Sequence, residues 1–215
     1  RFSAFAPSAR KSRRRFGAAL EPFTSVRVEL GRRKPGTDLR LLSSAEILRV
    51  RLGIARELER LALAAYLGEL AFRLAPEGIP TDLGARLEAA LDALDAHPAS
   101  RTLRRAFELR LALELGLSPR LDACVACGAP ATFLDFRRGG LLCAGHRGEG
   151  REIGPKTRAW LAHALASDAP APSGALTPDE AERAARAVGP SLDLALRDWL
   201  DRPLGALPLL TDLGL

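Results

Sequence analysis

The chain contains no methionine, only three cysteines and three histidines, and a single tyrosine among its 215 residues. Three cysteines cannot all pair with one another, which argues against a disulfide framework and favours a reducing compartment, so we expect the protein in the cytoplasm. No apolar run approaches the roughly 20 residues that cross a bilayer, and the first residues lack the apolar centre of a signal peptide. We therefore expect neither a membrane partner nor export. Because the chain begins at Arg1 without a methionine, we also expect some N-terminal structure to precede it.

Positive charge is concentrated at the N-terminal end. Residues 1–40 carry eleven Lys and Arg against three acidic residues, a net charge of +8, whereas the remainder carries −2. Clustered cations replace the counterions condensed on a polyanion, so nucleic acid should contact this segment first. The candidate DNA contacts lie in RKSRRR and GRRK: Arg10, Lys11, Arg13, Arg14, Arg15, Arg32, Arg33 and Lys34. Phe16 is a candidate for base stacking. A solvated charge run without a ligand is the alternative interpretation.

The same region has the pattern of short strands. Residues 2–6 and 23–30 alternate or cluster apolar and β-branched side chains, and residues 37–42 could pair with the latter across the turn-like GRRKPG. Both basic clusters would then lie in connections between strands. We interpret residues 1–43 as part of a small β domain.

Helical periodicity begins after Ser43. The stretch SSAE has the form of a capping box, with Ser43 as N-cap and Glu46 three residues later. The spacing of apolar residues and the capping signals at Thr81 and Ser100 predict four helices joined by short connections, as in an antiparallel bundle. Their expected ranges are 44–57, 58–75, 81–96 and 100–116. Tyr66, Phe72 and Phe107 are expected to fill the core.

Two further helices are predicted after residue 150. One covers residues 156–167, and the other begins behind a second capping box, TPDE, with Thr177 as N-cap and Pro178 at the first helical position. The second helix should continue to about Leu200 in two parts, with an interruption near Gly189 and Pro190. Trp160 and Trp199 should dock these helices on the bundle, and the apolar residues 203–215 should pack on the body.

The motif with the clearest chemistry is CVACGAPATFLDFRRGGLLCAGH. Cys124 and Cys127 are two residues apart, and Cys143 and His146 repeat that spacing after 15 intervening residues, which is typical of a Cys3His zinc ribbon. The segment between them predicts a hairpin with Arg137 and Arg138 at its tip. Four protein ligands would close the coordination sphere of Zn²⁺ and give it a structural role.

Other interpretations of this motif remain open. A redox CxxC normally opens a helix within a βαβ pattern, and it would leave Cys143 and His146 unexplained. Incidental cysteines with a solvated histidine are the other possibility. Elsewhere His97 and His163 are expected at the surface or in packing roles, and no catalytic triad, phosphate-binding loop or carboxylate pair stands out. We therefore assign no catalytic residue.

Three stretches resemble the RecO family of bacterial recombination mediators. RFSAFAPSARKSRRRFGAALEPF is similar to the end of the OB domain of that family, and AEILRVRLGIARELERLALAAYLGEL to its first bundle helices. AFELRLALELGLSPRLDACVACG followed by GGLLCAGH is similar to the helix that enters its zinc segment. The resemblance is ordered along residues 2–146 and is most specific over 106–146. The family's first OB strands have no counterpart here, and His146 stands where cysteine is common.

The resemblance implies an α+β, mostly helical fold: a truncated OB-like domain (1–43), a helical bundle (44–120), an inserted zinc ribbon (121–150) and C-terminal helices packed on the bundle (151–215). It also implies a nucleoid-associated, non-enzymatic mediator of DNA repair that binds single- and double-stranded DNA and anneals strands without ATP. RecR and the acidic C-terminal tail of the single-stranded-DNA-binding protein would be partners in loading recombinase. A zinc-dependent nucleic-acid enzyme and a zinc-ribbon protein-interaction adaptor are the alternatives.

Overall fold

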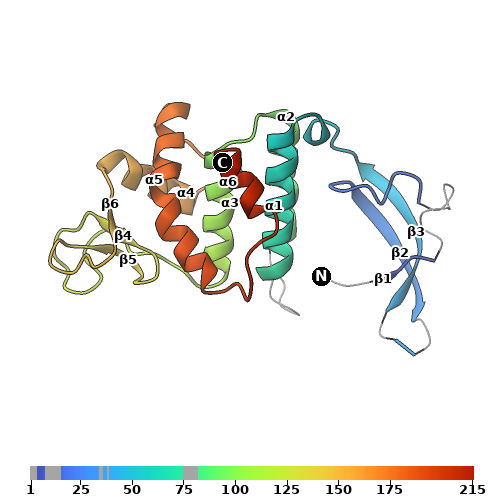
Figure 1. The fold of residues 1–215 in the computed structure, drawn as a ribbon, viewed down its shortest axis with the longest axis horizontal. Coiled ribbons are helices and arrows are strands. Elements are labelled where there is room, and N and C mark those ends of the chain that lie inside the picture. Colours follow the sequence, from blue (N-terminus) through green and yellow to red (C-terminus); the bar gives the residue numbers. More distant parts are fainter. Residues whose placement is uncertain (1–3, 8–15, 34–35, 38, 75–81) are drawn as a thin grey trace.

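The computed structural model describes residues 4–7, 16–33, 36–37, 39–74 and 82–215. Three parts follow one another along the longest axis of the molecule, with a small sheet at one end, helices in the middle and a second small sheet at the other end (Figure 1). Helices dominate, so the expectation of a mostly helical chain with small sheets is confirmed. Within the described residues, no helix is both long and apolar enough to cross a membrane.

The N-terminal sheet contains strands β1 (Ala4–Phe5), β2 (Ser25–Arg33) and β3 (Arg40–Arg49) in the order β1-β3-β2. Strand β2 pairs antiparallel with β3, and β1 pairs parallel with it. The two predicted strands do pair, but of the predicted pairing of residues 23–30 with 37–42 only Leu30 opposite Leu42 is confirmed, because residues 25–29 pair with residues 44–49.

The predicted helix 44–57 is wrong, because residues 44–49 belong to β3 and only a short 3-10 helix, η2 (Ile54–Arg56), follows. Glu46 of the predicted capping box and the neighbouring Ser44 bond across the sheet instead. Ser44 Oγ donates to Glu29 Oε2 at 3.0 Å, and Glu46 forms a salt bridge with Arg27. Pairing with a neighbouring strand gives backbone groups along the whole segment hydrogen-bond partners, which local capping of a helix end does not. The boundary expected after residue 43 thus falls inside β3.

A buried arginine joins this sheet to helix α2 (Leu83–Ala96). The guanidinium of Arg51 donates to Phe23 O at 2.9 Å, to Ser25 Oγ at 2.8 Å and to Asp92 Oδ1 at 2.8 Å, and it also bonds Glu88. Burial acts to raise the pKa of Glu88, but hydrogen bonds from Ser25 and Arg51 outweigh it and hold that pKa below its usual value. Arg51 therefore helps to fix the sheet against the helices, together with Arg49, which pairs with Asp92.

The remaining helices are α1 (Leu58–Leu74), α3 (Arg101–Glu114), α4 (Pro155–Ala166), α5 (Pro178–Arg197) and α6 (Leu207–Asp212). Ser100 accepts a hydrogen bond from Leu103 N, and Thr177 forms the complete capping box with Glu180, so both predicted caps are confirmed. The signal expected at Thr81 lies outside the described residues.

Helix α5 is continuous, which corrects the expected interruption at Gly189 and Pro190. The glycine serves packing rather than a break. A Cβ at position 189 would lie 2.7 Å from Arg105 Nη2, so only glycine lets this guanidinium lie against the helix.

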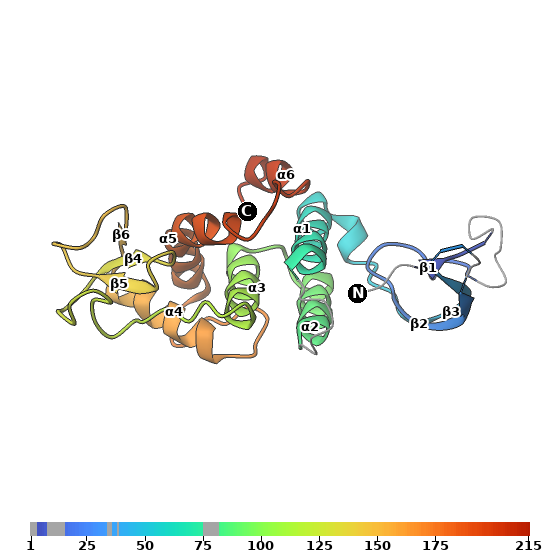
Figure 2. The same ribbon diagram turned by 90° about the horizontal axis from the view of Figure 1, so that it is seen from below.

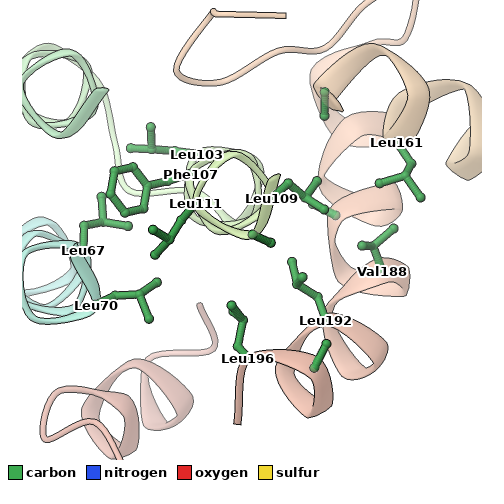
Figure 3. Close-up of a cluster of buried hydrophobic side chains, with 14 of the residues drawn as sticks. Leu67, Leu70, Leu103, Phe107, Leu109, Leu111, Leu161, Val188, Leu192 and Leu196 are labelled. Atoms are coloured by element: carbon green, nitrogen blue, oxygen red, sulfur yellow. The ribbon is translucent and has the colours of Figure 1, made fainter. Parts of the chain in front are cut away.

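Helix α3 is the centre of the helical part. Leu103, Phe107 and Leu111 point toward α1, whereas Leu109 points toward α4 and α5 (Figure 3). The helix is largely buried, and its buried residues include the charged side chains of Arg104, Arg105 and Glu108 as well as apolar ones.

The remaining bulky and C-terminal apolar residues divide between the core and the surface. Tyr66 and Trp160 are buried as expected, but Phe72 is 60% exposed and Trp199 37% exposed, so neither fills the core. Leu204 and Leu210 are buried, which confirms that the C-terminal residues pack on the body.

Helix α3 also carries a carboxylate with no solvent exposure. Glu108 accepts hydrogen bonds from Tyr66 OH at 2.5 Å, from Arg104 Nε at 2.8 Å and from Arg105 Nη1 at 2.6 Å. Arg105 also bonds Asp193 of α5. Burial acts to raise the pKa of Glu108, but the two guanidiniums outweigh it, and the pKa is lowered. The carboxylate thus stays charged because its partners are buried with it.

Replacing this carboxylate should destabilise the fold. We expect Glu108→Gln to lower the free energy of unfolding by about 3 kcal/mol near neutral pH, because it leaves two buried guanidiniums short of negative charge. A lowered folded pKa adds stability above the usual glutamate pKa, and this stability is lost as pH falls through the folded value. The difference between variant and wild type in urea unfolding should therefore shrink in acid. Glu152→Gln, on an exposed strand, is the matched control; equal stabilities at neutral pH would contradict the assignment.

Candidate metal centre and arginine pocket

The second sheet is a ribbon inserted between α3 and α4. Its strands are β4 (Phe133–Asp135), β5 (Gly140–Leu142) and β6 (Arg151–Glu152), in the order β5-β4-β6. Strands β4 and β5 form the predicted hairpin, with Phe133 opposite Leu142. Asp135 Oδ1 accepts from the amides of Arg137 and Arg138 at 3.0 and 3.3 Å, which shapes the tip.

Two turns of the ribbon bring the four predicted metal ligands together. In the first turn Gly128 N donates to Cys124 O at 2.8 Å, with Gly128 in the left-handed region at φ 76°. In the second, His146 N donates to Cys143 O at 3.0 Å. The ligand atoms of Cys124, Cys127, Cys143 and His146 all lie within 4.8 Å of one another. The group could therefore hold one metal ion.

Three of the six distances between these ligand atoms are close to those of a tetrahedral ion. The Sγ atoms of Cys127 and Cys143 are 3.8 Å apart, and His146 Nδ1 lies 3.3 Å from Cys143 Sγ and 3.8 Å from Cys124 Sγ. With zinc–sulfur bonds of about 2.3 Å and zinc–nitrogen bonds of about 2.0 Å, a tetrahedron has edges of roughly 3.8 Å between sulfurs and roughly 3.5 Å between sulfur and nitrogen. The donor set of three thiols and one imidazole is also one that Zn²⁺ takes.

The backbone around the first turn favours the thiolate that a metal requires. Burial acts to raise the pKa of Cys124, but the backbone amides of Cys143, Ala126 and Cys127 outweigh it and lower this pKa to about 6. Much of this thiol is therefore deprotonated at neutral pH, ready to bind a cation.

The ribbon is attached to the helices rather than independent of them. Phe136 N donates to Ser191 Oγ of α5 at 2.9 Å, and Leu134 and Phe136 are fully buried in the same apolar cluster as the helices. Four protein donors leave a tetrahedral ion no open position for substrate, so this arrangement suits a structural metal better than a catalytic one.

Most of the predicted DNA contacts lie outside the described residues: Arg10, Lys11, Arg13, Arg14, Arg15 and Lys34. Arg32 and Arg33 are exposed at the end of β2. Phe16 is only 3% exposed, so the prediction that it stacks on bases is wrong. The two ends of the molecule thus carry different features, because Arg32 and Arg33 lie in the N-terminal sheet and the metal ligands in the ribbon (Figure 1).

A pocket of about 460 Å³ lies between α1, α3, α5 and the C-terminal segment. Five arginines and one aspartate supply its charged lining: Arg101, Arg104, Arg105, Arg186, Arg197 and Asp193. Leucines supply much of its apolar surface. In the described part of the chain, Asp193 pairs with Arg104 and Arg105, and no carboxylate pairs with Arg186 or Arg197. The pocket therefore has an excess of positive charge beside apolar side chains.

The sequence carried a signal for this pocket that its analysis above missed. Arg101, Arg104 and Arg105 follow one another at helical spacings of three and four, so they share one face of α3. Arg186 and Arg197 are about three turns apart on α5 and share one face of it. What the sequence does not show is that these two faces meet.

Comparisons with known proteins agree with this structure. Residues 55–208 match the family described as Recombination protein O C terminal, and residues 1–51 match the one described as Recombination protein O N terminal. The chain belongs to the RecO family. The join between the two matched regions lies at residues 52–54, directly after Arg51.

Relatives within the RecO family cover nearly the whole chain. A DNA repair protein RecO of Anaeromyxobacter sp. (strain K) is 41% identical over 208 residues, which are 94% of this chain and 80% of the relative. Proteins of the same name from Pelobacter propionicus and Myxococcus xanthus are 41% and 35% identical, over 91% and 100% of this chain and 78% and 87% of theirs.

Removing one ligand tests the metal centre of this RecO-family chain. We expect Cys143→Ala to lose most of its bound zinc and to melt several degrees lower, because the ion then loses a thiolate and the ribbon loses its crosslink. Metal content by mass spectrometry and thermal melts check this. Glu149→Ala, an exposed change in the same ribbon, should do neither. Full zinc occupancy with an unchanged melt would refute the site.

Proposed function

We propose that this protein is a non-enzymatic mediator of DNA repair and recombination. It binds single- and double-stranded DNA, promotes annealing of complementary strands without ATP and, with RecR, helps load recombinase onto DNA coated by the single-stranded-DNA-binding protein. The observation that carries the proposal is the net charge of +8 on residues 1–40 of a chain that is otherwise nearly neutral. Membership of the RecO family supports it.

Annealing requires charge and access rather than a catalytic group. Two DNA strands repel each other through their phosphates, and cations that replace condensed counterions lower this repulsion while the strands sample registers. Base pairing then supplies the sequence specificity. Arg32 and Arg33 belong to the small N-terminal sheet, which lies at one end of the molecule (Figure 2). Long DNA can approach this end without contacting the helical part.

We assign the metal centre a structural role in this function. Zn²⁺ held by Cys124, Cys127, Cys143 and His146 fixes the ribbon against α5, at the end of the molecule opposite the N-terminal sheet. DNA binding should then depend on the metal only indirectly.

The DNA-contact assignment can be tested by charge removal. We expect Arg13→Ala, Arg14→Ala and Arg15→Ala together to weaken binding to many DNA sequences alike and to reduce the slope of log affinity against log salt by about 2, as expected for three lost phosphate contacts on single strands. Fluorescence anisotropy over a salt series measures both effects.

The control for this experiment removes the same charge elsewhere. Arg56, Arg183 and Arg202 are exposed on or beside the helices, and their joint replacement by alanine should leave the salt slope nearly unchanged. Equal losses in the two triple variants would mean that net charge, and not the N-terminal cluster, governs binding. Unchanged binding in the first variant would remove the contact assignment.

We further propose that the arginine pocket receives the acidic tail of the single-stranded-DNA-binding protein. Acidic side chains fit the unpaired guanidiniums of Arg186 and Arg197, and apolar side chains of a tail fit the leucines, which include Leu70 and Leu196. At such a site the opposite charges speed association of the ligand, and a buried apolar side chain slows its dissociation.

Removing the two unpaired arginines should weaken binding of the tail without unfolding the protein. We expect Arg186→Ala with Arg197→Ala to raise the Kd of a synthetic tail peptide by about tenfold, since each exposed ion pair contributes up to about 1 kcal/mol. Isothermal titration calorimetry measures it. Arg56→Ala with Arg183→Ala has the same charge change and should bind as wild type; a peptide that binds both double variants equally occupies another surface.

A further inference from the structure

One wall of the arginine pocket is made by a segment that lies outside the layers of long helices. We name residues 201–215 the C-terminal strap; it contains α6, and Figure 2 shows α6 to one side of the row formed by α5, α3 and α1. Leu204, Leu207, Thr211, Gly214 and Leu215 of the strap line the pocket. Most strap residues are at least partly exposed, and Leu204 and Leu210 are its buried anchors.

The first part of the strap is held by α1, away from the pocket lining. Glu69 accepts from Gly205 N at 3.0 Å and from Ala206 N at 3.2 Å. Arg73 donates to Pro203 O at 3.0 Å and to Asp201 Oδ1 at 2.6 Å. Neither Glu69 nor Arg73 lines the pocket, so these contacts fasten the strap without taking part in ligand binding.

The end of the strap is held by the arginines of the pocket itself. Arg104 Nη1 donates to Leu215 O at 2.6 Å, and Arg101 Nη2 donates to Gly214 O. Gly214 O, the acceptor of Arg101, is a neutral backbone carbonyl. A carboxylate is a stronger acceptor for a guanidinium than a carbonyl, because charge-assisted hydrogen bonds are roughly twice as strong as neutral ones.

We propose that the C-terminal strap is a gate on this pocket, whose end competes with an acidic ligand for Arg101 and Arg104. In the closed state, described here, Gly214 O and Leu215 O accept hydrogen bonds from the two guanidiniums. An acidic peptide that enters the pocket takes them over and releases residues 213–215, while Leu210 keeps α6 seated. The inference rests on the proposed function of the pocket, because it needs an acidic ligand.

The gate has a direct thermodynamic consequence. A ligand that binds only the open strap has its apparent affinity reduced by the fraction of molecules in the open state. Any change that loosens the strap without touching the pocket should therefore strengthen binding. The direction of this change distinguishes a gate from a wall that contributes to binding, because loosening such a wall would weaken binding.

The test uses two variants that loosen the strap, with the synthetic tail peptide as the probe. Leu210→Ala removes the fully buried anchor and Arg73→Ala removes the fastening on α1; neither residue lines the pocket. We expect both to bind the peptide about threefold to tenfold more tightly than wild type. Leu141→Ala, which removes a fully buried leucine of the ribbon, is the matched control and should not change the affinity.

Hydrogen exchange supplies a readout on the strap itself. The amides of Leu213, Gly214 and Leu215 bond to Leu209 O, Thr211 O and Leu210 O in the closed state. Peptide binding to wild type should speed exchange at these three amides while leaving α3 and α5 at least as protected. Should Leu210→Ala misfold, Arg73→Ala and the exchange measurement still decide.

The outcomes separate the gate from the proposed pocket. If the wild type binds the peptide and both loosened variants bind it equally or more weakly, the gate is overturned and the pocket assignment stays intact. The same holds if peptide binding slows exchange at residues 213–215. Absence of peptide binding in wild type and in both loosened variants overturns both. Binding that appears or strengthens when the strap is loosened supports the gate.

Discussion

The helical part depends on one buried carboxylate. Glu108 has no exposure, and its partners reach into three other segments: Tyr66 lies on α1, Arg105 continues to Asp193 on α5, and Arg104 continues to Leu215 at the end of the strap. Apolar packing around α3 tolerates small shifts, but hydrogen bonds among buried charges do not, because an unpaired charge in the core is very unfavourable. The network therefore fixes which faces of α1, α3 and α5 meet, and with them the arrangement of the pocket.

Local signals predicted what local interactions decide. The caps at Ser100 and Thr177 were read from the sequence because they bond within three residues of themselves. Residues 44–49 were misread because their partners, Arg27 and Glu29, lie in another strand. Gly189 was misread for a related reason: the guanidinium that requires it belongs to α3 and is more than eighty residues away. Phe72 and Trp199 were placed by their size alone, which does not say which side of a helix meets the core.

The two candidate sites differ in the same respect. All four predicted metal ligands lie within 23 residues, in two turns of identical spacing, so their type and spacing were sufficient to predict the cluster. The arginine pocket is assembled from α1, α3, α5 and the strap, and a sequence does not show that such distant segments meet. The sequence showed the arginines of the pocket, but it did not show that they line a concave surface.

The ribbon and the helices share a single apolar cluster, in which Cys124, Leu134 and Phe136 pack with residues of α1 to α5. A ligand that binds only the folded state stabilises everything that unfolds with its site, by about 1.4 kcal/mol for each tenfold excess over its dissociation constant. A metal ion held by the ribbon would thus stabilise helices that it does not touch. With such an ion, the folded fraction of the whole helical part would depend on the free metal concentration, so that metal supply would set how much of the protein survives heating.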